Sequence, residues 1–422
     1  MKKEKNIRKT VLVVIAAIGS LVFLGCHSSK EVLKEENKVI LRFFHYQGEA
    51  EEAYNKLFDA YEQANPNVKI VSEFINSDSY GDVLEARIAI KDYPDVIGVH
   101  PGSHVLLLGK AGYLADLSEN GCLAGSSESS LKAASVGESV YGVPTDQSYI
   151  CTFYNKKIFE EYQLEIPKTW DEFMDVCRIL KENDVTPISI GFKDTWLEPL
   201  VAYAVAPTTI YKENEHFDDE MYAGKKNFQG EEWYSTLEMV QKLFTEGYVP
   251  EKFLDITYEQ QLDTFAQEKA GMMIMGSWAV SMIQNLNPEC EFGLFVTPAS
   301  DDGENWIAAS VGGMLGVCEK SEQKETAMDF LNFFLQNDEV YGQFLEDTGN
   351  LSARMDFMEK CDLKLQQLMA EVDGSYSFLD VNWPSGFSDD FCAEMEAVGR
   401  GKEISPILDA LDISWKKRIE GK

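Results

Sequence analysis

The chain has 422 residues, a formal net charge of −33 at pH 7 and 45% hydrophobic residues. Such an acidic chain repels the phosphates of nucleic acid, which is therefore excluded as a partner. A length of about 400 residues exceeds what one hydrophobic core usually serves, so two domains are expected.

The N-terminus has the features of a secretion signal. Basic residues from Lys2 to Lys9 precede an apolar run from Val11 to Gly25. That run is shorter than the roughly 20 residues of a membrane span. We therefore interpret residues 1–25 as a cleaved signal peptide rather than a permanent transmembrane anchor.

Cys26 is the predicted lipidation site. The segment Phe23-Leu24-Gly25-Cys26 resembles the lipobox of bacterial lipoproteins, although Leu and a small residue are more usual at the first two positions. The resemblance implies that Cys26 is acylated and becomes the mature N-terminus. Acyl chains hold a protein at the bilayer surface, so we expect a lipid anchor on the extracytoplasmic face of the cell membrane. Residues 26–38 would then form a polar tether.

The seven other cysteines lie far apart, and no C-x-x-C pair occurs. The spacing fits neither a disulfide framework nor a zinc site. Most of these cysteines are expected to be buried in the core, and one disulfide between two of them is the alternative. His100 and His104 could share a helix face, but Pro101-Gly102 between them argues against a helix. We therefore expect neither a metal site nor a cofactor.

The first part of the chain alternates strands and helices. Buried strands are predicted at 39–44, 68–74 and 95–99, with helices at about 49–64 and 80–91 between them. Pro66 ends the first of these helices. The alternation indicates an α/β lobe with a parallel sheet.

Longer helices follow Pro144. The first is predicted from Thr169 to Glu182, where Thr169 and Glu172 form a T-x-x-E capping box. The remaining predicted elements are strands at 187–190, 271–275 and 292–297 and helices at about 231–246, 257–268, 321–345 and 405–419.

Several short motifs occur in a characteristic order. They are Tyr141-Gly142-Val143-Pro144, Phe153 to Glu160, Pro167 to Phe173, Phe265 to Met272, Gly276-Ser277-Trp278 and Gly312-Gly313. In this order and spacing they resemble the family 1 extracellular solute-binding proteins, the group that includes the maltose-binding protein.

The resemblance implies a periplasmic-binding-protein-like α/β fold of two lobes with a ligand cleft between them. It also implies about three hinge crossings, which we expect near 146–150, 296–299 and 338–344. The N-terminal lobe would then comprise residues 39–147 plus 298–340, and the C-terminal lobe residues 148–297 plus 341–422.

Aromatic residues in loops are candidates for a sugar site, because flat rings stack on the C–H faces of pyranoses. Trp278 ends an apolar strand where the family often presents an aromatic ring to the ligand, and Trp196 follows the strand at 187–190. Trp306 and Trp383 occupy other loops and are further candidates. The remaining tryptophans fall at helical spacing and are expected in the core: Trp170, Trp233 and Trp415.

Polar candidates follow the predicted strands, where loops of α/β lobes face a cleft. They are His45, Tyr46 and Gln47 after the first strand, Asp78 after the second, His100 after the third and Asp146 at the first crossing. Tyr149, in the same crossing, and Gly313, in the Gly312-Gly313 motif, complete the expected ligand-binding set.

The resulting hypothesis is a monomeric binding lipoprotein that captures a sugar or oligosaccharide by hinge closure and delivers it to the permease of an ABC transporter. A polyamine, peptide or iron complex is the alternative solute. A surface adhesion lipoprotein and a glycosidase are more remote alternatives, the latter because many carboxylates could form its pair. The hydrolase, zinc-protease and nucleotide-binding motifs are missing from the sequence, so we expect no catalytic residues and no enzyme.

Overall fold

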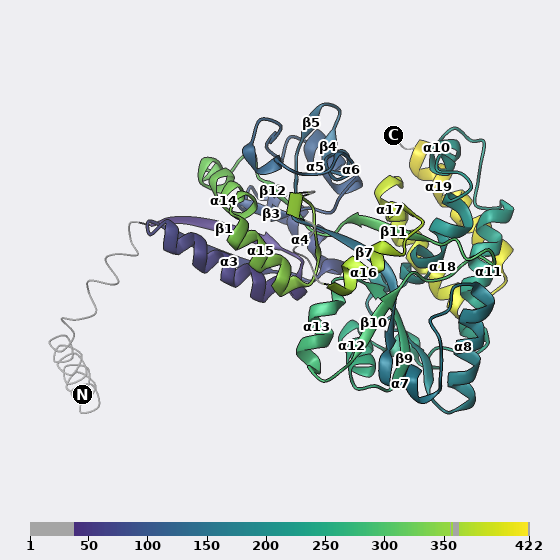
Figure 1. Cartoon of the computed structure of the whole chain (residues 1–422). Helices are drawn as coiled ribbons and strands as arrows, with labels where there is room; N and C mark the ends of the chain where they lie inside the picture. The colour runs from purple at the N-terminus through teal and green to yellow at the C-terminus, as the bar shows by residue number, and fades with distance from the viewer. Residues whose placement is uncertain (1–37, 355, 358–362, 421–422) are drawn as a thin grey trace, which may run out of the picture.

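The computed structural model describes residues 38–354, 356–357 and 363–420, and it has two lobes, each built on a β-sheet covered by helices (Figure 1). The expected signal peptide and Cys26 lie outside the described residues. Among the helices of the described part, none has both the length and the apolar character of a membrane span.

The sheet of the first lobe confirms the predicted strand–helix alternation. Its order is β2-β1-β3-β12-β6, with β1 parallel to β2 and β3, and β12 antiparallel to its neighbours. The strands are β1 (Val39–His45), β2 (Val68–Phe74), β3 (Val96–Gly98), β6 (Val143–Pro144) and β12 (Met314–Val317). The lobe also contains α3 (Glu51–Ala64), α4 (Ser77–Ala89), α5 (Ser103–Lys110), α6 (Glu128–Ala133) and the hairpin of β4 (Ser135–Val136) and β5 (Ser139–Val140), and two later helices, described below, complete it.

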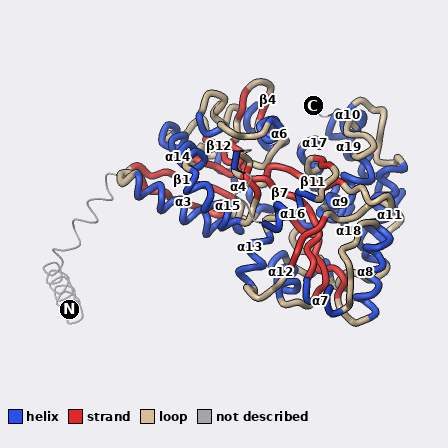
Figure 2. Tube along the Cα trace, in the orientation of Figure 1, coloured by secondary structure: helices blue, strands red, loops and turns tan. Residues whose placement is uncertain are grey.

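The sheet of the second lobe is centred on β7 (Asp146–Asn155), which runs from the junction of the lobes into the second lobe (Figure 2). The order is β14-β11-β7-β9-β8, and β10 and β13 also pair with β7. Its other strands are β8 (Thr186–Ser189), β9 (Ala270–Gly276), β10 (Phe292–Phe295), β11 (Trp306–Val311), β13 (Leu351–Ser352) and β14 (Gly374–Tyr376).

Helices surround this second sheet. They are α7 (Lys156–Glu161), α8 (Trp170–Glu182), α9 (Leu200–Ala206), α10 (Phe217–Tyr222), α11 (Glu231–Thr245), α12 (Tyr258–Ala266), α13 (Ala279–Leu286), α16 (Leu363–Ala370), α17 (Leu379–Asn382), α18 (Phe387–Gly399) and α19 (Ile404–Glu420). The three tryptophans assigned to the core, Trp170, Trp233 and Trp415, are buried, as predicted. The six cysteines of the described part are free and buried: Cys122, Cys151, Cys177, Cys290, Cys318 and Cys392.

The predicted capping box at the start of α8 is confirmed. Thr169 Oγ1 accepts from the N–H of Glu172 at 3.3 Å, and the Glu172 carboxylate accepts from the N–H of Thr169. This pair satisfies two N–H groups that the first helical turn leaves without partners.

Replacing Thr169 by Ala should lower the free energy of unfolding by about 1 kcal/mol, because the N–H of Glu172 loses its acceptor. Urea unfolding followed by tryptophan emission would measure it. Thr169→Ser retains the hydroxyl and should stay within a few tenths of a kcal/mol of the parent. Equal midpoints for the Ala and Ser variants would contradict the capping role.

The long helix predicted at 321–345 is wrong, because two helices occupy that stretch. α14 (Lys324–Gln336) ends before Asn337, and α15 (Asp338–Thr348) begins after it. Asn337 has non-helical backbone angles, and its side chain accepts from the N–H groups of Glu339 and Val340. An asparagine N-cap of this kind starts a new helix in a new direction.

The chain changes sheet at three places that differ in part from the expected ones. The first change lies between Pro144 and Asp146, immediately before the expected range 146–150. The second lies at Gly312-Gly313 rather than 296–299, because β11 pairs with β7 and β12 with β3. The third lies near Asn350 rather than 338–344, because α15 packs on α3 of the first lobe and β13 pairs with β7.

Candidate functional site between the lobes

Contacts between the lobes beside the hinge include two that involve α4 and α5 of the first lobe. Thr195 Oγ1, on the short helix η3 (Thr195–Leu197) of the second lobe, donates to Asp78 Oδ1 on α4 at 3.0 Å. Helix α17 meets α5, where a Cβ atom on Gly102 would lie 2.5 Å from the carbonyl oxygen of Val381. The lobes are therefore in contact through α4 and α5 of the first lobe.

The first lobe presents a stacked pair of rings toward the second. The rings of Tyr46 and His100 lie 3.9 Å apart at 27°. Tyr80 supports Tyr46 from behind, and its hydroxyl donates to the carbonyls of Phe44 and Gly98 at 3.1 and 2.8 Å. Burial lowers the pKa of His100 to about 3, so its imidazole is neutral and has one donor and one acceptor nitrogen.

The second lobe presents a row of aromatic side chains. Trp196 lies 4.9 Å from Tyr258 and 6.2 Å from Trp278 between ring centroids, and Trp278 lies 6.5 Å from Phe378. The two tryptophans are half-buried. The indole of Trp278 lies directly over Gly276, where a Cβ atom would be 2.1 Å from the ring. Gly276 therefore fixes the position of Trp278.

Two carboxylates complete the arrangement, one from each lobe. Burial raises the pKa of Tyr258, and Glu49 on the short helix η1 (Gly48–Ala50) of the first lobe raises it further. Burial also raises the pKa of Tyr46, and Asp380 on α17 of the second lobe is among the carboxylates that add to this effect. Burial raises the pKa of Asp380 and raises that of Glu49 to about 7.

These side chains belong to two ring groups, one on each lobe, and to carboxylates that act on the rings of the opposite lobe, and we refer to them as the interlobe site: Tyr46, Glu49, His100, Trp196, Tyr258, Trp278, Phe378 and Asp380. Aromatic faces offer flat apolar contact, while carboxylates and a neutral imidazole exchange hydrogen bonds at fixed directions. That combination suits a ligand with both C–H faces and hydroxyl groups.

A separate polar cluster joins the three crossings. Asp146 is 1% exposed, and its Oδ1 accepts from the N–H of Gly313 at 2.5 Å while its Oδ2 accepts from Asn350 Nδ2 at 3.0 Å. Its carbonyl accepts from the N–H of Gly312 at 3.1 Å. Tyr341 on α15 adds a bond of 2.8 Å from its hydroxyl to the carbonyl of Thr145. Asp146 thus holds all three crossings together.

The structure brings only part of the predicted ligand-binding set to the junction. Tyr46, His100, Trp196 and Trp278 lie in the interlobe site, and Asp78 lies at its edge against Thr195. The other polar candidates gather at the crossings: Gln47, Asp146, Tyr149 and Gly313. A Cβ atom on Gly313 would lie 2.7 Å from Gln47 Nε2, and the Tyr149 hydroxyl donates to Gln147.

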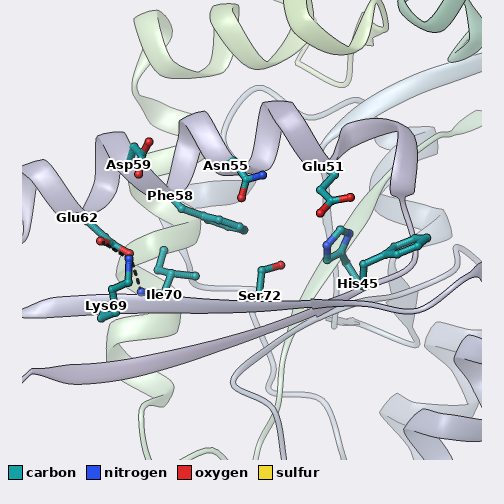
Figure 3. A pocket seen from close by; sticks show the side chains of 10 residues that line it. His45, Glu51, Asn55, Phe58, Asp59, Glu62, Lys69, Ile70 and Ser72 are labelled. Carbon is teal, nitrogen blue, oxygen red and sulfur yellow. Dashed lines mark hydrogen bonds and ion pairs between the residues drawn. The ribbon is translucent and has the colours of Figure 1, made fainter.

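His45 faces away from Tyr46, because successive side chains of a strand point to opposite faces. It lines a groove of about 410 Å³ between α3 and strands β1 and β2, together with Phe58, Ser72 and Phe74 (Figure 3). This groove belongs to the first lobe alone. The structure therefore places His45 apart from the interlobe site.

Trp306 and Trp383 also lie apart from that site. Trp306 begins β11, at the opposite end of the strand from the crossing at Gly312, and its indole lies over Gly374. Trp383 is 3% exposed and packs on Phe391 at 4.7 Å, within the core of the second lobe.

Four residues of the interlobe site were missed by the sequence reasoning: Glu49, Tyr258, Phe378 and Asp380. Glu49 and Tyr258 each stand at the start of a predicted helix, where an acidic or aromatic residue is common and does not by itself indicate a binding site. Phe378 and Asp380 fall in a segment with no motif. Only Glu49 had a signal in the sequence, because it lies four residues beyond a buried strand, in a region where polar residues were expected to face the cleft.

Gly276→Ala should displace the Trp278 indole, because the new methyl would occupy its position. We expect a shifted Trp emission spectrum and a loss of ligand affinity of roughly tenfold, in line with about 1.4 kcal/mol of lost packing. Gly81→Ala is the matched control, since a Cβ atom there meets nothing within 4 Å. An unchanged spectrum in the Gly276 variant would show that the ring does not depend on this glycine.

Comparisons with known proteins agree with this architecture. Residues 47–341 match the family model described as bacterial extracellular solute-binding protein. The chain is 25% identical over 411 residues to the multiple sugar-binding protein of Streptococcus mutans, covering 96% of both chains. It is 23% identical over 335 residues to the melibiose/raffinose/stachyose-binding protein of Bacillus subtilis, covering 77% of this chain and 76% of that one.

A solved structure has the same fold. The solute-binding protein RafE in complex with raffinose superposes with a TM-score of 0.78 at 23% sequence identity, covering 90% of this chain and 100% of RafE. The family model spans more than half of this chain, and both lobes have counterparts in the solved structure. The chain therefore belongs to the family of bacterial extracellular solute-binding proteins.

Proposed function

We propose that this protein captures a sugar or oligosaccharide between its lobes and delivers it to the permease of an ABC transporter. The observation that carries the proposal is the interlobe site itself, which combines the row from Tyr258 to Phe378 on the second lobe with the Tyr46–His100 pair on the first and links them through Glu49 and Asp380. The multiple sugar-binding protein and the melibiose/raffinose/stachyose-binding protein support the same class of ligand.

Capture proceeds by hinge closure. A saccharide stacks first on the half-buried Trp196 and Trp278, and rotation about the crossings held by Asp146 then brings Tyr46 and His100 onto it. The Thr195–Asp78 hydrogen bond forms as the lobes meet. Closure excludes water from the ligand and creates the surface that the permease recognises.

The anchor and the oligomeric state are part of the proposal. The family is extracytoplasmic, and acylation of Cys26 would hold the folded lobes near the outer face of the membrane. The protein acts as a monomer, because both halves of the interlobe site come from one chain. Mass spectrometry of the membrane-extracted protein, with Cys26→Ser as control, tests the anchor.

Thermal unfolding of the chain from His27 onward tests capture. The panel contains raffinose, stachyose, maltotriose and chitotriose, with spermidine and a tripeptide as the other solutes. A ligand at a hundredfold excess over its dissociation constant should add about 2.7 kcal/mol to the free energy of unfolding. The saccharide should be recovered intact after incubation, because a glycosidase would cleave it. A shift with spermidine or peptide and none with any saccharide would contradict the proposal.

A further inference from the structure

The charged groups of the interlobe site are the acids Glu49 and Asp380. Burial raises the pKa of Tyr46, and Glu49, Asp146 of the neighbouring polar cluster and Asp380 raise it further; Glu49 likewise adds to the effect of burial on Tyr258. They come from different elements of the two lobes, so both lobes contribute carboxylates that act on these rings.

The edge of the site is also acidic. Burial raises the pKa of Asp389 on α18 and of Glu198 beyond η3, and nearby carboxylates on α4 add to it: Asp78 and Asp82 for Asp389, and Asp78 for Glu198. Arg418 is the base beside Asp389, but its Nε donates to Asp390 at 2.7 Å and one of its terminal nitrogens donates to the carbonyl of Ser385 at 3.0 Å. Its charge is therefore already paired with Asp390.

One of these carboxylates has an oxygen without a partner. Asp380 Oδ1 is buried and meets no donor at hydrogen-bonding geometry in the described part of the chain. A buried acceptor left without a donor is costly, and a ligand hydroxyl or ammonium group would satisfy it. A ligand carboxylate or sulfate would instead place like charges together where water is excluded.

We infer that the interlobe site admits neutral and amine-bearing saccharides and excludes anionic ones such as uronates and sulfated or phosphorylated sugars. This inference rests on the proposed function, because it concerns the same site. It follows from the unpartnered Asp380 oxygen and from the acids contributed by both lobes.

The test uses derivatives of whichever neutral saccharide gives the largest melting shift in the panel. Oxidation of its primary alcohols yields the uronate, which is then converted to the uronamide, and a second route gives the 6-amino-6-deoxy derivative. Uronate and uronamide have nearly the same shape and differ in charge. Isothermal titration at pH 7.5 should show the uronamide and the amine binding at least about 100-fold more tightly than the uronate.

A double variant, Glu49→Gln with Asp380→Asn, should reduce the ratio of the affinities for uronamide and uronate, referred to here as the gap, by at least tenfold. Glu238→Gln on the exposed face of α11 is the matched control and should leave the gap unchanged. Equal affinities for uronate and uronamide, or a gap that the double variant leaves intact, would overturn the inference. A panel in which no neutral saccharide binds would instead refute the proposed function, and this inference with it.

Discussion

Trp278→Ala should weaken saccharide binding by roughly 30- to 100-fold, which corresponds to about 2–3 kcal/mol for an aromatic anchor in a water-excluding site. The side chain is half-buried at the centre of the row, between Trp196 and Phe378. Removing it would leave the sugar without its central stacking surface and admit water. Titration calorimetry with the saccharide of the panel gives the loss directly.

Trp306→Ala is the matched control for this prediction. Trp306 is also a half-buried tryptophan of the second lobe, but it lies at the far end of β11. Its removal should change the melting temperature by a similar amount and leave the affinity within about twofold of the parent. Equal losses of affinity in both variants would mean that Trp278 contributes through stability rather than contact.

The predicted elements agree with the structure where periodicity or a cap gave a local signal. The strand at 68–74 and the box of Thr169 and Glu172 are examples, because each depends on residues next to one another in the sequence. The division at Asn337 also had a local signal, since asparagine followed by Asp338 and Glu339 is typical of a helix start. The apolar spacing continues across this division, which explains why one helix was predicted.

The candidate site was harder to predict, because its residues meet only after the lobes are assembled. His45 ends β1 and Tyr46 comes directly after it, and only one of these neighbours can face the second lobe. Which one does so depends on how β1 is covered, with α3 on the His45 side and Tyr80 of α4 on the Tyr46 side. Asp380 is placed by the contact of α17 with α5 and has no sequence neighbour that reveals it.

Asp146 illustrates the same limit at the hinge. The sequence placed it at the first crossing as a possible ligand contact, whereas the structure shows both of its carboxylate oxygens already occupied by Gly313 and Asn350. Its partners lie 167 and 204 residues away along the chain. A residue that joins three crossings can be recognised only when all three are positioned.

Asp146→Ala should lower the free energy of unfolding by about 2–5 kcal/mol, because the buried N–H of Gly313 and amide of Asn350 would each lose an acceptor. Asp146→Asn is the matched control. Its remaining oxygen can accept from Gly313, and Asn350 can turn so that its own oxygen, which lacks a partner among the described residues, accepts from the new amide. Urea unfolding at pH 7.5 should therefore rank the Asn variant close to the parent and the Ala variant far below it.

The pH dependence separates the charge of Asp146 from its hydrogen bonds. Burial raises its pKa from 3.8 to about 6 in the folded protein. A raised folded-state pKa favours folding at low pH, and the benefit is lost as the pH rises through about 6. The Asn variant has no such titration, so its stability relative to the parent should increase between pH 4 and pH 7.5. A constant difference over that range would show that the Asp146 carboxylate ionises as easily at the hinge as in the unfolded chain.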